Sequence, residues 1–83
     1  MTTYALRLTS RYDGLVVATF PDVPEAIGYG RDDEEAREEG LRALERVLEA
    51  ARRAGEALPV PRASGSQWVT TAFQPEIIPA AIS

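Results

Sequence analysis

The arrangement of the predicted elements depends on residues 20–36, whose sequence is FPDVPEAIGYGRDDEEA. This stretch connects an apolar segment to the one long helical pattern in the chain, and it contains two prolines and two glycines. Proline has no amide hydrogen to donate to a β-ladder, so Pro21 is expected to end the preceding strand, and Pro24 to stiffen the connection. The stretch is therefore predicted to lead the chain from one strand to the next and then into a helix.

A glycine pair follows the prolines. A short strand is expected over residues 26–29, and Gly28 and Gly30 are two positions apart, so they share one face of the extended chain. Because neither residue has a Cβ, another element can approach that face closely. The pair lacks the third glycine, the lysine and the hydroxyl of phosphate-binding loops, which argues against a nucleotide site.

A helix of about twenty residues is predicted to begin at Asp32 or Asp33. Asp32 can accept hydrogen bonds from first-turn amides, and Glu35 completes an aspartate form of the capping box. The acidic residues 32–35 lie where the helix dipole favours negative charge, and Gly55 supplies a left-handed cap at the other end. Apolar or small residues recur every three or four positions, which predicts one buried face. They are Ala36, Gly40, Leu41, Leu44, Val47, Leu48 and Ala51.

Glycine inside a helix costs about 1 kcal/mol relative to alanine, so Gly40 is expected to mark a tight contact with the sheet. On the exposed side, ion pairs four residues apart are expected, each worth about 0.3–0.5 kcal/mol. These pairs are Asp33–Arg37, Glu38–Arg42 and Glu49–Arg53.

Two strands are expected before the prolines. Residues 3–12 alternate apolar and polar side chains, which is typical of a strand with one buried face. Residues 15–20 are apolar on both faces and suit the middle of a sheet. Between them, Asp13 and Gly14 predict a hairpin with a two-residue turn.

A last strand is expected after the helix. Residues 56–65 form a loop with two prolines, and residues 67–73 have strand character, with Trp68 and Val69 on opposite faces. The apolar residues 75–83 form a short tail. The sequence thus predicts one α+β domain over its 83 residues, with a core at 1–74, a three-stranded antiparallel meander, one long helix packed on the sheet and a further strand.

The length and composition of the chain limit the kinds of protein that it can be. The chain is 45% hydrophobic and 27% charged, as in ordinary globular domains. A chain of this length buries only roughly 60% of its unfolded surface, so a homo-oligomer, dimer or tetramer, is expected. No basic segment followed by an apolar run opens the chain, and no stretch reaches membrane-spanning length, so we expect a cytoplasmic protein and no membrane partner.

The chain contains no cysteine and no histidine. It therefore lacks the thiol nucleophile, the commonest general base and the usual zinc ligands. The carboxylates of Asp13, Asp22 and residues 32–35 could hold a divalent cation only if several converged, and turn and capping roles account for them more simply. We predict no enzyme, and we assign no catalytic, cofactor-binding or metal-binding residue.

The formal net charge is −4. An acidic surface repels phosphates, and the arginines do not cluster without acidic neighbours, so direct binding to nucleic acid is not expected. A basic protein partner would be steered towards the chain.

Two sets of residues occur at a spacing typical of one protein family. The first set is Phe20, Pro21, Asp22, Val23, Pro24, Gly30, Glu35 and Ala36, and the second is Gly55, Leu58, Pro59 and Pro61. This pattern resembles the N-terminal domain of HicB-like antitoxins, the inhibitory partners in HicA–HicB toxin–antitoxin pairs. The chain departs from the family at Glu25-Ala26, where Gly-Cys is usual, and at Arg31-Asp32 and Gly40. The C-terminal DNA-binding domain common in the family is not among the 83 residues.

The resemblance implies a β-β-β-α-β domain with a partial ribonuclease-H-like arrangement. It also implies a self-associating module that covers the RNA-binding face of a small basic HicA-like toxin, which degrades messenger RNA. The alternatives are an orphan HicB-like oligomeric module and a degenerate ribonuclease-H-like, metal-dependent nuclease. A fold alone confers neither toxin binding nor nuclease activity.

Candidate contact residues follow from the turn, the acidic helix start and the last strand. The predicted partner-binding residues are Phe20, Pro21, Asp22, Pro24, Glu25, Asp33 and Glu34. The predicted oligomer interface consists of Trp68, Val69 and Phe73.

Overall fold

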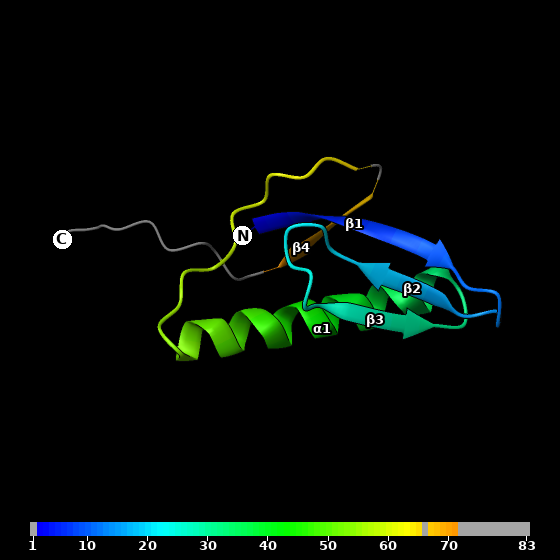
Figure 1. The fold of residues 1–83 in the computed structure, drawn as a ribbon, viewed down its shortest axis with the longest axis horizontal. Coiled ribbons are helices and arrows are strands. Elements are labelled where there is room, and N and C mark those ends of the chain that lie inside the picture. The colour runs from blue at the N-terminus through cyan, green and yellow to red at the C-terminus, as the bar shows by residue number, and fades with distance from the viewer. Residues whose placement is uncertain (1, 66, 72–83) are drawn as a thin grey trace.

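A computed structural model describes residues 2–65 and 67–71 of the chain (Figure 1). The elements are β1 (Thr2–Ser10), β2 (Val16–Thr19), β3 (Ile27–Gly30), α1 (Asp33–Arg53) and β4 (Gln67–Thr71). All the strand pairs are antiparallel, and the strand order in the sheet is β3-β2-β1-β4. The predicted α+β fold, a meander followed by a helix and a further strand, is confirmed.

The element boundaries within the described residues differ from the predicted ones by at most two residues. β2 lies between β3 and β1, as its apolar character on both faces predicts. The predicted extension of the last strand to Phe73 lies outside the described residues.

The turn between β1 and β2 has three residues, so the predicted two-residue turn is wrong. The amide of Arg11 donates to the carbonyl of Leu15 at 2.7 Å, and the amide of Gly14 donates to the carbonyl of Arg11 at 3.1 Å. Gly14 takes a left-handed conformation with φ of 89°. A three-residue loop that ends in a left-handed glycine also matches the twist of a hairpin, so the Asp-Gly pair serves the longer turn.

The helix lies against β3 through glycines on both elements. A Cβ on Gly28 would overlap the backbone of Gly40, and a Cβ on Gly30 would overlap the backbone of Ala36. A Cβ on Gly40 would lie 2.8 Å from the Cβ of Ala18. The predicted tight contact at Gly40 is confirmed, and the glycine pair of β3 forms its other half.

Both ends of α1 are capped by residues that the sequence indicates. The Oδ1 of Asp32 accepts a hydrogen bond from the Glu35 amide at 2.8 Å. The carboxylate of Glu35 accepts from the amide of Arg31 at 2.7 Å, one residue before the position that a capping box would use. At the other end, Gly55 has φ of 76°, and its amide and that of Glu56 donate to carbonyls of the last turn, which is a Schellman motif.

The core lies between α1 and the inner face of the sheet. It also includes the two apolar residues of the turn before β3, Val23 and Ala26. On the helix, Leu41, Val47 and Ala51 are only half-buried, and Ala43, which the predicted stripe omits, is buried. The buried stripe is narrower than predicted because α1 packs mainly over the β3 side of the sheet.

Among the described residues, no helix combines the length and apolar character needed to cross a membrane.

The glycine contact makes a prediction about stability. Gly40→Leu is expected to lower the free energy of unfolding by about 1–3 kcal/mol, because overpacking against Ala18 outweighs the gain in helix propensity. Glu38→Leu, at an exposed position of the same helix, is expected to change it by less than about 0.5 kcal/mol. Urea denaturation of both variants measures this difference. A Gly40→Leu variant as stable as the original would contradict the packing.

Candidate partner-binding site

The predicted partner-binding residues fall into two groups at opposite ends of α1. Asp33 and Glu34 form its first turn. Glu25, from the turn before β3, lies beside Val47 and Ala51 of the C-terminal half. A helix rises about 1.5 Å per residue, so the two groups are about 25 Å apart. One small contact cannot cover both groups.

The turn before β3 is built from two successive tight turns. The amide of Val23 donates to the carbonyl of Phe20 at 2.9 Å, and the amide of Ala26 donates to the carbonyl of Val23 at 3.0 Å. Phe20 is only 1% exposed and belongs to the core, so its side chain does not reach the surface. Pro21, Pro24 and Glu25 are exposed.

Asp22 has a structural partner that sequence reasoning missed. Its carboxylate accepts hydrogen bonds from the amides of Arg62 and Ala63, each at 2.9 Å from Oδ2. The side chain thus fastens the loop between α1 and β4 to the turn before β3. The local sequence indicates only a turn position for Asp22, and it predicts the side chain as a partner contact. The amides it binds are about forty positions away, so only the tertiary structure brings them together.

A buried tyrosine fastens the same loop. The hydroxyl of Tyr4 on β1 donates to the carbonyl of Pro59 at 2.6 Å. Burial, together with the nearby negative charge of Asp22, raises the pKa of the Tyr4 phenol. Ionisation of the phenol would put a second negative charge near the Asp22 carboxylate and would remove the hydrogen bond that the hydroxyl donates to Pro59. The neutral phenol is therefore favoured.

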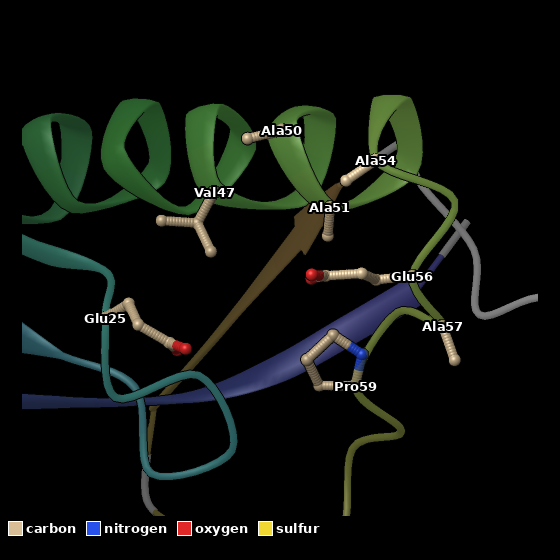
Figure 2. A pocket seen from close by; sticks show the side chains of 8 residues that line it. All are labelled: Glu25, Val47, Ala50, Ala51, Ala54, Glu56, Ala57 and Pro59. Atoms are coloured by element: carbon tan, nitrogen blue, oxygen red, sulfur yellow. The ribbon is translucent and has the colours of Figure 1, made fainter.

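A cleft lies where this loop, the turn before β3 and the C-terminal half of α1 meet (Figure 2). It has a volume of about 500 Å³. The lining residues are Glu25, Val47, Ala50, Ala51, Ala54, Glu56, Ala57 and Pro59. Figure 2 shows the carboxylates of Glu25 and Glu56 directed into the cleft from opposite sides, over a floor of alanine and valine side chains.

The acidic start of α1 carries carboxylates that lack counter-charges. Within the described residues, the carboxylates of Asp33 and Glu34 form no hydrogen bond or ion pair. The predicted Asp33–Arg37 pair is wrong, because Arg37 reaches β4, where it donates to the carbonyl of Trp68 at 3.3 Å and to the side chain of Gln67.

The other ion pairs on α1 are local. Glu49 pairs with Arg53 at 2.8 Å, as predicted. Arg42 pairs with Glu39 instead of Glu38, so the second predicted pair is wrong. The amide of Arg31, and then its side chain, lower the pKa of Glu35, which keeps that carboxylate ionised at the helix start.

The predicted oligomer residues lie on different faces of β4. Trp68 is 45% exposed on the face away from α1, whereas Val69 is 7% exposed and packs in the core. Phe73 lies outside the described residues. On the same outer face, Ile27 and Tyr29 are exposed, and the guanidinium of Arg11 lies 5.8 Å from the centre of the Tyr29 ring. Trp68 and Val69 can contact one partner together only at the edge of β4.

No cluster of three or more acidic side chains in the described part of the chain is arranged to hold a metal ion. Comparison of the sequence with protein-family models and with curated proteins gives no match. The resemblance to HicB-like antitoxins therefore rests on the motif residues and their spacing.

The role of Asp22 can be tested separately from binding. Asp22→Ala is expected to lower the free energy of unfolding by about 1–2 kcal/mol, because two loop amides lose their acceptor. The amides of Arg62 and Ala63 should then exchange with solvent faster in hydrogen-exchange measurements. Glu34→Ala removes a carboxylate without a partner and should leave the exchange of both amides unchanged. Unaltered exchange in Asp22→Ala would contradict the anchoring role.

The Tyr4 phenol predicts a pH dependence. Because its pKa is higher in the folded chain than in the unfolded chain, the stability it contributes is full below about pH 10 and is lost as the pH rises through the folded-state pKa. The free energy of unfolding should fall more steeply above pH 10 in the original protein than in Tyr4→Phe. Tyr12→Phe, at a position that is 99% exposed, should follow the original profile. Parallel profiles for all three proteins would contradict the assignment.

Proposed function

We propose that the chain is an antitoxin-like binding module of the HicB kind. It would neutralise a small basic toxin that degrades messenger RNA, by covering the toxin's RNA-binding face in the cytoplasm. The sequence motif that runs from Phe20 to Pro61 suggests the family, and the observed element order agrees with what the resemblance implies.

The observation that carries the proposal is the unneutralised charge at the start of α1. Asp33 and Glu34 are exposed, and Arg37, the nearest expected counter-ion, binds β4 instead. The helix dipole stabilises carboxylates at this end, so they persist without an ion pair. A basic partner that binds here gains attraction to charges that no described arginine already neutralises.

Self-association is part of the proposal. In the described sheet, β4 is an edge strand next to β1, and Trp68 is exposed on it. An edge strand can pair with a strand of a second copy, and a large aromatic residue beside that edge suits such an interface.

The test is co-expression with the short basic protein that we expect a neighbouring gene to encode. The two proteins should co-purify, and the complex should leave messenger RNA intact where the basic protein alone degrades it. Sedimentation of the complex gives the number of copies of each chain. Absence of binding and of protection would overturn the proposal.

A matched pair of variants locates the contact. Asp33→Asn/Glu34→Gln should weaken binding about 2- to 30-fold, because two exposed ion pairs are lost. Glu45→Gln/Glu49→Gln gives the same net charge but leaves the helix start unchanged, and should bind nearly as tightly as the original. Equal weakening in both variants would mean that net charge alone, and not the helix start, governs the association.

A further inference from the structure

The cleft at the C-terminal half of α1 combines two features that no local folding role requires. The helix lines it with the apolar side chains of Val47, Ala50, Ala51 and Ala54. Its two opposite sides carry the carboxylates of Glu25 and Glu56, which come from different loops (Figure 2). An apolar surface between two negative charges restricts what can bind there.

Neither carboxylate is used by the fold. In the described chain, Glu25 and Glu56 form no side-chain hydrogen bond or ion pair. By contrast, Glu49 on the same half of α1 binds Arg52 and Arg53, at 3.6 and 2.8 Å. The C-terminal end of the helix dipole adds further negative potential.

These features select one kind of occupant. A wholly apolar group would desolvate two carboxylates without giving them a partner, and an acidic group would be repelled. An arginine side chain has an apolar stem that can cover alanine methyl groups. Its planar guanidinium presents N–H donors along several edges, so it can bind two carboxylates at once, which the compact charge of lysine does less well.

We propose that the cleft is a binding site for an arginine side chain presented by a partner protein. The stem lies on Val47 and Ala51, and the guanidinium lies between Glu25 and Glu56. The inference rests on the proposed function only in assigning the arginine to a basic protein. It places a second contact at the opposite end of α1 from Asp33 and Glu34.

The experiment uses the full chain labelled at its alanine methyl groups. It is titrated with an acetylated, amidated Ala-Leu-Arg-Leu-Ala peptide and with the same peptide carrying citrulline, which has the shape of arginine without its charge. The arginine peptide should shift the methyl signals of Ala50, Ala51 and Ala54 in a saturable way. The affinity for the citrulline peptide should be lower by about tenfold or more, because the charged hydrogen bonds are lost.

Two variants provide the matched control. Glu25→Gln/Glu56→Gln keeps the shape of the cleft and removes its charges, and should weaken binding of the arginine peptide about tenfold. Glu38→Gln/Glu45→Gln gives the same net charge away from the cleft and should bind within about twofold of the original. Equal affinities for the two peptides, or equal losses in the two variants, would overturn the proposal.

Other occupants would give distinct results, each of which also overturns it. Nuclear Overhauser contacts from Ala54 to Ile77 or Ile78 in the free protein would show that the chain's own tail fills the cleft. Methyl shifts that depend on protein concentration without peptide would show a second copy there. If the neighbouring basic protein does not bind but the peptide does, the proposed function fails and the arginine site stands. The reverse result rejects the arginine site alone.

Discussion

The backbone contact between α1 and β3 is the constraint on which the rest of the structure depends. Gly28 faces Gly40, and Gly30 faces Ala36, with no room for a further carbon atom at either glycine of the strand. This contact fixes both the position and the direction of the helix along the strand. Since β3 has only four residues, the C-terminal half of α1 extends beyond the strand. The turn before β3 and the loop after α1 pack there, and the cleft lies between them.

The direction of α1 also sets the path of the next loop. The helix ends far from the point where β4 begins, so residues 54–65 must return along the sheet past β1 (Figure 1). The hydroxyl of Tyr4 and the carboxylate of Asp22 bind this loop from the sheet and from the turn. A returning segment without secondary structure needs such partners for its backbone groups. Hence the proline-rich turn is as much a structural anchor as a candidate contact.

The same packing determines where charge remains available to a partner. Arg37 binds β4, and so no arginine of residues 2–65 or 67–71 neutralises Asp33 and Glu34 at one end of α1. At the other end, Glu25 and Glu56 face each other over apolar side chains. We infer a bipartite acidic surface, with an exposed charge cluster at one end and a shaped cleft at the other. A basic protein that contacts both ends would extend along the whole helix.

The sequence by itself determined the features that depend on neighbours a few positions apart. Helix caps, strand alternation and the order of elements follow from such short-range rules, and they predicted the α+β fold and the tight contact at Gly40. Only the tertiary structure decided the partners of Asp22 and Arg37, the burial of Phe20 and the existence of the cleft. The partners of Arg37 and Asp22 lie 30 to 41 positions away, as in Arg37 with Gln67 and Asp22 with Ala63. Such pairs become neighbours only once the sheet order and the glycine contact are set.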